Sequence, residues 1–323
     1  MEIWDVVNEF REKTEKTHIR GEELQEGSFH EIVHVWIMNE EGKLLIQQRQ
    51  PWKIGWPNMW DCAAAGSALC GETPEIAAVR ETKEELGIDL DIESAEVLFT
   101  VGSPKGFDDN FLVKQNVEKW ELQYEEVAAA RWATIEEIRE MVHSGEFIPY
   151  HILENVFEII ASEISLQKAY PSDAQSLYNL QKQVFKQMYE KYQDHDTTPF
   201  NQTFERFKER LNQGTFYKIT IAQELVGSVH VYKKSAGVMR LHMINILEGY
   251  QGRGIAQTVI KRLEMLYPEA RSWELDTILQ EQKNCYLYEK MGYKQTGESK
   301  RINDKMTIVS YEKKEGFHHL KVW

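Results

Sequence analysis

Hydrophobic and polar residues in the first half of the chain fall into short runs. Four of these runs are rich in β-branched and aromatic residues and have turn-like flanks, which is typical of strands: 31–38 (EIVHVWIM), 43–49, 95–101 and 128–134. The intervening NEEGK predicts a hairpin turn between the first two. Longer segments at 74–86 and about 150–162 are predicted to be helices.

The pattern starts afresh near residue 163. ISLQKA predicts a short strand, and YPSDAQSLYNLQKQVFKQMY predicts a helix with Ser172 or Asp173 as its N-cap. The remaining elements alternate in type: strands at 216–222, 225–232 and 239–247, a helix at 254–266, a strand at 272–278 and a helix at 284–291. With a length of 323 residues, this order predicts a mixed α/β protein of two domains, 1–163 and 164–323.

Charge divides the chain at the same place. Residues 1–163 hold 14 Lys and Arg against 34 Asp and Glu, a net −20, whereas residues 164–323 hold 24 against 18, a net +6. An acidic half suits cations and a mildly basic half suits phosphates, although solubility alone also explains such charge. The 42% hydrophobic and 11% aromatic content excludes a disordered chain.

Three cysteines without a CxxC pair favour a reducing compartment, so we expect a cytoplasmic protein. The first residues, MEIWDVVNEF, lack the basic and apolar regions of a signal peptide. No apolar run approaches the roughly 18 residues of a membrane span. We expect neither a membrane nor a nucleic-acid duplex as a partner, and the sequence leaves the oligomeric state open.

The helix predicted at 74–86 has clear ends. Thr73 can cap its N-terminus, Pro74 fits the first helical position, and Gly87 fits the residue after its C-terminus. Ile76 and Val79 are predicted to form part of a buried stripe, with Leu86 nearby.

Three carboxylates share one face of this helix, because Glu81, Glu84 and Glu85 stand at i, i+3 and i+4. Like charges at this spacing each cost about 0.2–0.5 kcal/mol. A cation on that face would offset the repulsion, and several oxygens suit Mg²⁺ or Mn²⁺. The alternative is a solvated face with Arg80 and Lys83 as intrahelical partners.

The surrounding residues resemble the Nudix box, G-x5-E-x7-R-E-U-x-E-E-x-G-U. The match covers every fixed position: Gly66, Glu72, Arg80, Glu81, Glu84, Glu85, Gly87 and Ile88. Thr82 alone departs, standing where the family prefers an aliphatic residue. The resemblance implies an α/β/α sandwich and a divalent-metal-dependent hydrolase of diphosphate-linked compounds. It also implies that Glu81, Glu84 and Glu85 hold the metal and serve catalysis, and that Arg80 is structural.

The segment before the box, with Trp60 and Asp61 at its end, resembles the isopentenyl-diphosphate-isomerase-like branch of the Nudix family. Isomerases carry a catalytic cysteine and a metal-binding histidine on either side of the box glycine, where this chain has Ala65 and Ser67. Because the glutamates are intact and these two residues are absent, hydrolysis is favoured over isomerisation.

The same branch implies further site residues. Arg49 and Lys53 stand at its diphosphate-contacting positions, with ordinary surface charge as the alternative. His30 stands where isomerases have another metal-binding histidine, and His34 is a weaker candidate. Glu125 or Glu126 falls where many members place an additional acidic residue near the metal. Cys62 and Cys70 are interpreted as small packing residues.

In the second half, LHMINILEGYQGRGIAQTVIKRLE predicts a strand, a glycine-rich loop and a helix. Such a loop and the helix N-terminus can cradle an anion. Together with NCYLYEKMGY about thirty residues later, this segment resembles the motifs of GNAT acetyltransferases, with Ala256 in place of the commoner glycine and Glu248 where many members have proline.

The GNAT resemblance implies acetyl-CoA as co-substrate and an amine as acceptor. Residues expected to bind the cofactor are Ile244, Ile246, Gln251, Gly252, Arg253, Gly254, Ile255, Ala256 and Asn284. Tyr288 would protonate the departing thiolate, since a tyrosine hydroxyl has comparable basicity, and a core aromatic is the alternative. His242, Glu248 and a bound water are candidates for the general base.

The sequence therefore predicts a bifunctional enzyme, with a Nudix diphosphatase followed by an acetyltransferase. The alternative is an acetyltransferase regulated by a Nudix module that senses a ligand without catalysis. The loops GSPKGFDDN and QDHDTTPFNQ are expected to carry specificity.

Overall fold

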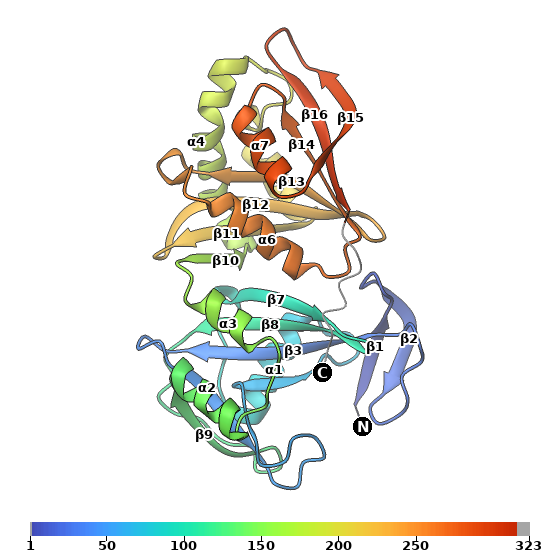
Figure 1. Cartoon of the computed structure of the whole chain (residues 1–323), viewed down its shortest axis with the longest axis vertical. Coiled ribbons are helices and arrows are strands. Elements are labelled where there is room, and N and C mark those ends of the chain that lie inside the picture. Colours follow the sequence, from blue (N-terminus) through green and yellow to red (C-terminus); the bar gives the residue numbers. More distant parts are fainter. Residues whose placement is uncertain (1, 315–323) are drawn as a thin grey trace. The chain divides into compact units, whose positions relative to one another are not determined.

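The computed structural model describes residues 2–314 and divides them into two compact units, between Ser162 and Glu163 (Figure 1). None of its helices is both long and apolar enough to cross a membrane within the described residues. The predicted boundary after residue 163 differs from this division by one residue.

The first unit is built around β3, His30–Met38. One edge of β3 pairs in parallel with β8, and the other pairs antiparallel with β4 at one end and with β6 at the other. Strand β4 pairs with β9 along its other edge, and beyond the two residues paired with β3 it also pairs with β5. The strands of this sheet are β4 (Leu44–Arg49), β5 (Trp60–Asp61), β6 (Ala64–Ser67), β7 (Glu96–Gly102), β8 (Gly106–Lys114) and β9 (Val127–Ala133).

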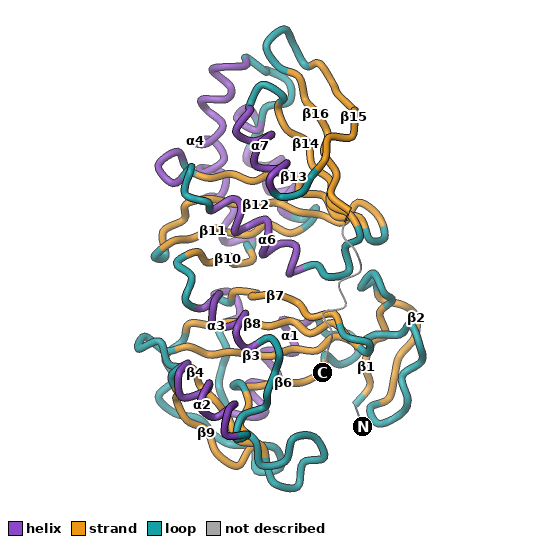
Figure 2. The backbone as a smooth tube through the Cα atoms, in the orientation of Figure 1, coloured by secondary structure: helices purple, strands orange, loops and turns teal. Residues whose placement is uncertain are grey.

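Helices and a separate hairpin complete this unit (Figure 2). The hairpin consists of β1 (Ile3–Val7) and β2 (Lys13–Ile19), which pair antiparallel. The helices are α1 (Pro74–Leu86), α2 (Ile135–Ser144) and α3 (Leu153–Ile160), with a short 3₁₀ turn, η1, at Ile92–Ser94.

Helix α1 begins and ends as its sequence predicts. The Thr73 hydroxyl accepts the Ile76 amide at 3.4 Å, and Gly87 closes the helix at φ 69°, a conformation that favours glycine. Its buried apolar residues are Ala77, Ala78 and Leu86, which belong to the same core cluster as the β3 side chains Val33, Val35 and Ile37. The predicted burial of Ile76 is wrong, since 51% of this residue is exposed. Small alanines let α1 lie close to the sheet, which fixes where its glutamates point.

The second unit is a seven-stranded sheet in the order β10-β11-β12-β13-β14-β16-β15. All neighbours are antiparallel except β13 and β14. The strands are β10 (Ile164–Lys168), β11 (Thr215–Ile221), β12 (Glu224–Ser235), β13 (Val238–Ile246), β14 (Ser272–Ile278), β15 (Lys294–Arg301) and β16 (Thr307–Lys314).

Four helices accompany this sheet: α4 (Ala174–Tyr192), α5 (Phe204–Leu211), α6 (Ile255–Leu266) and α7 (Gln282–Lys290). Short 3₁₀ turns lie at η2 (Pro171–Asp173), η3 (Pro199–Asn201) and η4 (Glu248–Tyr250). The N-cap of α4 is Asp173, one of the two residues predicted for it.

Strands β13 and β14 separate soon after they meet. Their parallel register covers only Val238–Arg240 against Ser272–Glu274, whereas β13 continues to Ile246 beside β12. The two strands therefore form a fork, and a cavity opens where they part.

The sequence predicts some helices and strands and misses others. Nine helices and strands of the structure are not predicted: β1, β2, β5, β6, β8, α2, α5, β15 and β16. The interpretation of GSPKGFDDN as a loop is wrong for residues 106–110, because these begin β8. Asp109 and Asn110 in this strand are buried, so the polar composition that suggested a loop belongs to a buried polar cluster.

Candidate functional sites

Two of the three glutamates of α1 that are predicted to bind metal turn inward. The Glu81 side chain is 15% exposed and Glu85 is 5% exposed, whereas half of the Glu84 side chain reaches solvent. Glu81 lies directly against Gly66 of β6. An ideal Cβ at Gly66 would stand 2.7 Å from Glu81 Oε2 and closer still to Oε1 and Cδ. Only glycine leaves room for this carboxylate at that position.

Arg80 holds the box together. Its guanidinium donates two hydrogen bonds to Glu72, at 2.8 and 2.9 Å, and one to the Ser67 carbonyl at 2.9 Å. It also contacts Glu81 at 2.8 Å and Glu84 at 3.2 Å. A planar fork with several donors suits this bridging. Arg80 thus joins the loop, β6 and α1, as expected of a structural residue.

Glu85 lies in a buried and electronegative place. Burial, helped by the neighbouring Glu81, raises the pKa of Glu85 to about 8, although Gln47 of β4 donates to its Oε2 at 2.7 Å. The other Gln47 side-chain atom, Oε1, is buried and has no hydrogen-bond partner among the described residues. Burial likewise raises the pKa of Glu81.

These observations fit a divalent cation. Two carboxylates whose pKa values are raised by burial lie one helical turn apart, and Arg80 pairs with Glu81 whereas Glu85 has the neutral Gln47 as its partner. A positive charge beside Glu85 would therefore lower the free-energy cost of its ionised form. The orphaned Gln47 oxygen adds a further hard ligand atom or an acceptor for a coordinated water. These residues fit Mg²⁺ or Mn²⁺, and Glu81, Glu84 and Glu85 stay the predicted ligands.

Thr82, the one departure from the box pattern, is fully buried. Its hydroxyl donates to the Ala78 carbonyl one turn earlier at 2.7 Å. This local bond satisfies the hydroxyl, so its methyl group can pack where an aliphatic residue is usual.

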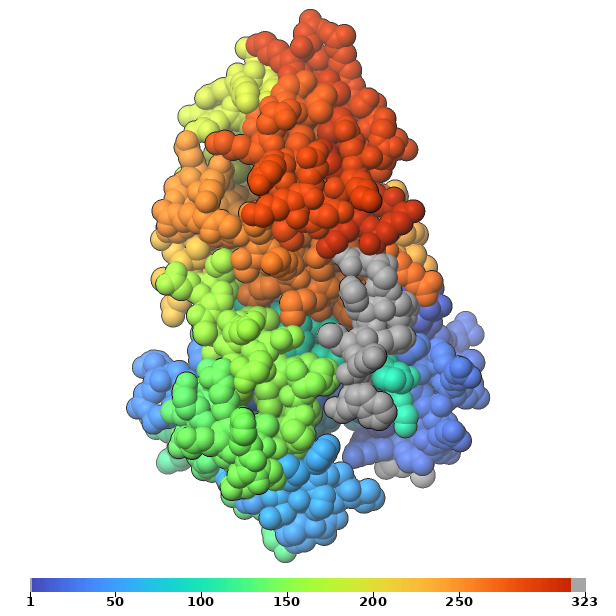
Figure 3. Space-filling view, viewed as in Figure 1, coloured from blue at the N-terminus to red at the C-terminus, as the bar shows by residue number. Residues whose placement is uncertain are grey.

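The two predicted phosphate-binding residues both have partners in the structure. Arg49 donates to the Gly55 carbonyl at 3.0 Å and lies 3.7 Å from Asp61, and Lys53 pairs with Glu126. Lys53 is partly buried within the otherwise exposed segment 51–58, which forms the light-blue surface at the bottom of Figure 3. Of the two acidic candidates, Glu126 carries a charge that helps to raise the pKa of Glu85. The backbone carbonyl of Glu125 accepts a hydrogen bond from the indole N–H of Trp52.

The contacts of His30 are with residues other than those of the carboxylate cluster. Its ring stacks on Trp4 with centroids 4.3 Å apart, and burial lowers its pKa to about 4. Cys62 is buried, as interpreted, but Cys70 is exposed, so its interpretation as a packing residue is wrong.

A buried polar network that the sequence analysis did not identify lies around His34. Its Nδ1 is 2.7 Å from Asp108 of β8, and its Nε2 is 3.2 Å from the Tyr150 hydroxyl. That hydroxyl donates to Asp61 at 2.9 Å. Burial disfavours a charged imidazole, but Asp108 outweighs it and raises the pKa of His34 to about 8. These residues are up to 116 positions apart, so no local motif could reveal them.

The second unit contains a cavity of about 1420 Å³ at the fork between β13 and β14. Most predicted cofactor-binding residues line it: Ile244, Ile246, Gln251, Gly252, Gly254, Ile255, Ala256 and Asn284. Arg253 is not among the lining residues; its guanidinium lies over the ring of Tyr250, 5.1 Å from the centroid. The structure thus brings together residues from β13, the following loop, α6 and α7.

The loop before α6 has the shape of an anion cradle. Gly252 and Gly254 take φ values of 75° and 80°, which favour glycine, and Gly254 caps α6. The Gln251 side chain ties the loop to β13 by donating to the Ile246 carbonyl at 2.9 Å. The first amides of a 12-residue helix therefore face the cavity end of the fork.

Tyr288 of α7 lines the same cavity and is 7% exposed. Burial raises its pKa to about 12, so the hydroxyl keeps its proton at any physiological pH. Among the base candidates, His242 lines the cavity, and burial together with Arg210 lowers its pKa. Glu248 accepts a hydrogen bond from Gln187 and is not a lining residue.

Comparison with known proteins agrees with this division. Residues 28–155 match the model of the NUDIX domain, and residues 185–315 match that of an acetyltransferase (GNAT) domain. An uncharacterized Nudix hydrolase from Listeria innocua is 52% identical over 161 residues, which is 49% of this chain and 95% of that protein. An isopentenyl-diphosphate Delta-isomerase from Salmonella arizonae is 27% identical over 39% of this chain and 74% of its own length.

A solved GNAT-family acetyltransferase from Streptococcus pneumoniae covers 47% of this chain and 99% of its own, with 17% identity and a TM-score of 0.39. The sequence matches agree with the geometry of the glutamate box in the first half and with the fork of strands in the second half. The chain is an enzyme that belongs to the Nudix hydrolase family and carries a GNAT acetyltransferase domain in its second half.

Proposed function

We propose that the first half hydrolyses a diphosphate-linked small molecule with the help of Mg²⁺ or Mn²⁺. The observation that carries this proposal is the set of three carboxylates on one face of α1, two of them buried against the sheet. A module that only binds its ligand would not need two buried carboxylates one helical turn apart.

Each residue of the site has a defined task in this proposal. Glu81, Glu84 and Glu85 hold the cation, which lowers the pKa of a water and offsets phosphate charge when bound. Gly66 and Arg80 fix the position of Glu81, and Gln47 fixes that of Glu85. Such fixed positions matter, because small displacements of reacting groups cost large factors in rate.

Arg49 and Lys53 are proposed to bind the diphosphate. Both are cations with acidic partners, Asp61 and Glu126, so a substrate phosphate would exchange one anionic partner for another. Ala65 and Ser67 offer neither a thiol nor an imidazole next to the box, which supports hydrolysis over isomerisation.

A screen of diphosphate compounds with Mg²⁺ or Mn²⁺ tests this proposal, with an added phosphatase to release phosphate from the phosphomonoester products for measurement. Glu84→Gln should abolish release, whereas Glu140→Gln, the same change at an exposed position of α2, should leave it intact. Release by Glu84→Gln at the wild-type rate would refute the assignment.

We propose that the second half transfers an acetyl group from acetyl-CoA to an amine. The observation that carries this is the fork of β13 and β14, whose cavity is lined by the glycine loop and by Tyr288. The loop amides would bind the pyrophosphate, Asn284 and strand residues Ile244 and Ile246 would contact the rest of the cofactor, and Tyr288 would protonate the departing thiolate.

Thiol release from acetyl-CoA in the presence of an amine panel tests this second activity. Tyr288→Phe should lower kcat by about 10²-fold or more, the usual size of a general-acid contribution. Tyr217→Phe is the matched control, because Tyr217 is equally buried but does not line the cavity. Equal loss in both variants would point to a packing role for Tyr288.

A second candidate is that the first half senses a diphosphate ligand without hydrolysing it and regulates the acetyltransferase. In this alternative, the pairs of Arg49 with Asp61 and of Lys53 with Glu126 would open when the ligand binds. Saturable binding without phosphate release across the panel, together with a ligand-dependent change in acetyl transfer, would select this alternative.

A further inference from the structure

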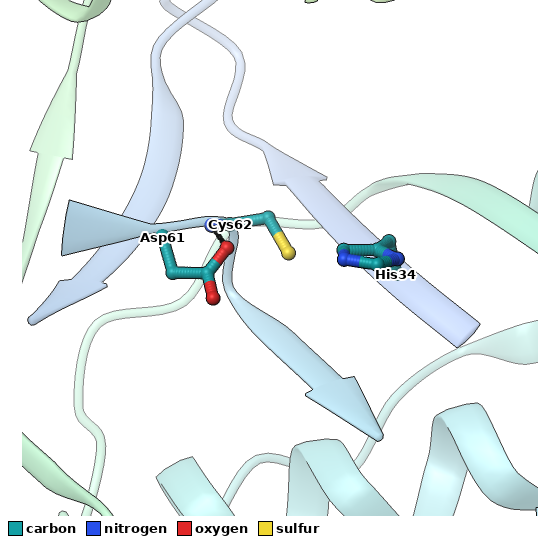
Figure 4. A group of neighbouring side chains, drawn as sticks. All are labelled: His34, Asp61 and Cys62. Atoms are coloured by element: carbon teal, nitrogen blue, oxygen red, sulfur yellow. Dashed lines mark hydrogen bonds between the residues drawn. The ribbon is translucent and has the colours of Figure 1, made fainter. Parts of the chain in front are cut away.

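Three side chains with metal-binding atoms meet inside the first unit, apart from the α1 glutamates. His34 comes from β3, Asp61 ends β5, and Cys62 follows it (Figure 4). Their ligand atoms all lie within 4.8 Å of one another, and the residues are 7%, 1% and 0% exposed. We propose that these three residues form a site for Zn²⁺, distinct from the Mg²⁺ or Mn²⁺ site of the proposed hydrolase.

The donor set selects the kind of metal. An imidazole nitrogen, a thiolate sulfur and a carboxylate oxygen are the ligands of protein zinc, whereas Mg²⁺ takes oxygens. Tetrahedral bonds of about 2.0–2.3 Å place neighbouring ligand atoms about 3.3–3.8 Å apart. The present separations of up to 4.8 Å therefore need to close by about 1 Å, which side-chain rotation can supply.

His34 is already oriented as a zinc ligand. Its Nδ1 is held at 2.7 Å by Asp108, so its Nε2 faces the other two residues. A histidine whose second nitrogen is fixed by a carboxylate is the usual arrangement behind bound zinc. The Tyr150 hydroxyl contacts both His34 Nε2, at 3.2 Å, and Asp61 Oδ1, at 2.9 Å. It thus lies next to two of the three ligands and is available as a fourth ligand or as a donor to a coordinated water.

Charge is conserved when zinc enters. Without metal, His34 Nδ1 faces the Asp108 carboxylate and Nε2 faces a hydroxyl that itself donates to Asp61, so both ring nitrogens act as donors, and the Cys62 thiol donates to the Ala64 carbonyl. On binding, the Nε2 proton of His34 and the thiol proton of Cys62 leave to solvent as the Zn–N and Zn–S bonds form. Two positive charges leave and two arrive, so the net charge of the buried cluster does not change. Zinc therefore enters without adding net charge to the interior.

In the metal-free structure the Cys62 thiol donates a hydrogen bond to the Ala64 carbonyl at 3.3 Å, and a Zn–S bond would take the place of this hydrogen bond. A packing role alone would be served by alanine, which occupies the next three positions of the chain.

The experiment measures metal in the full-length protein expressed with zinc and dialysed against a weak chelator, since a buried site is loaded during folding. We expect about one tightly held zinc per chain, consistent with a single set of ligands. Replacement by Co²⁺ should give the charge-transfer absorption of a thiolate–cobalt bond, which a hard-oxygen site does not produce.

Variants assign the ligands. Cys62→Ser and His34→Gln should lose the zinc and the absorption band, whereas Cys70→Ser and Cys285→Ser should keep both, because these thiols lie outside the cluster. Wild-type protein without bound zinc, or a Cys62→Ser variant that keeps the zinc and the cobalt band, would overturn the proposal.

If the two ligand variants do not fold, X-ray absorption of the wild-type protein still decides. One sulfur neighbour at about 2.3 Å in a four-coordinate shell supports the site, and a shell of oxygen and nitrogen alone refutes it. The outcome is independent of the proposed hydrolase, because Glu84→Gln should leave zinc content unchanged while it abolishes phosphate release.

Discussion

Replacing Gly66 by alanine tests the geometry of the glutamate site most directly. The added methyl group would stand 2.7 Å from Glu81 Oε2 and closer to its other two carboxyl atoms. Since comfortable heavy-atom contacts are about 3.5 Å, the carboxylate must retreat by about 1.5 Å, an amount set by its closest atom, Oε1. Arg80, which holds this carboxylate at 2.8 Å, must move with it or lose the contact.

The expected loss follows from this displacement. A misplacement of about 1 Å at a catalytic group costs on the order of 10²-fold in rate. Overpacking of this kind also costs about 1–3 kcal/mol of stability. We therefore expect kcat for phosphate release to fall by about 100-fold, while the protein stays folded at assay temperature.

The assay compares Gly66→Ala with wild type in steady-state phosphate release and in thermal unfolding. Gly249→Ala is the control, because its added methyl group meets no atom within 4 Å and its backbone φ is ordinary. A Gly66→Ala enzyme with wild-type kcat would show that the position of Glu81 does not matter to the reaction, and the proposed site would be wrong.

Three further predictions concern charge. In metal-free protein the pKa of Glu85, about 8, exceeds its unfolded value near 4.5, so the folded state binds the extra proton and the free energy of unfolding should fall as pH rises between these values. In Glu85→Gln this fall, measured by chemical denaturation, should be smaller, because the raised pKa values of His34 and Glu81 supply the rest. Arg80→Lys should cost about 1–3 kcal/mol by denaturant titration, whereas Arg139→Lys, at an exposed ion pair, should change stability less. Because the pKa of Tyr288 is about 12, acetyl transfer should show no loss of the general acid up to about pH 10, and a fall centred near pH 8 would exclude Tyr288 from that role.

Local sequence signals account for the best-predicted part of the fold. Helix α1 runs from Pro74 to Leu86 as expected, because a cap, a proline and a glycine determine its ends without help from distant residues. The same kind of signal was present but overlooked in α2, where Thr134 and Glu137 form a reciprocal capping box.

Other elements have no local signal. Strand β2, KTEKTHI, is almost entirely polar and forms because it pairs with β1. Strand β8 contains Asp108, Asp109 and Asn110, whose polarity suggests a loop and not a strand. Its carboxylates have partners elsewhere in the unit: Asp108 contacts His34, and Asp109 pairs with Arg11, 98 residues away. Such pairs become visible only when the chain is folded.

The candidate sites show the same contrast. Glu81, Glu84 and Glu85 share a helix face by spacing alone, so the sequence could predict that they would meet. That Glu84 is half exposed while Glu85 is buried beside Gln47 depends on how α1 faces the sheet, which spacing does not determine. The cluster of His34, Asp61 and Cys62 depends on the pairing of β3 with β6 and of β4 with β5, and has no signal along the chain.

Where β13 and β14 part, one edge of β13 has no neighbouring strand in the described part of the chain, although β13 lies in the middle of the sheet of the second unit. From Leu241 onward, β13 has a ladder partner on only one side among the described residues. Its remaining amides and carbonyls toward the fork can be satisfied by water or by a linear ligand that itself carries amide groups. A ligand of that kind would act as an extra strand, so its binding should slow hydrogen exchange along β13 as a neighbouring strand would. Ligand binding and sheet completion would then be the same event.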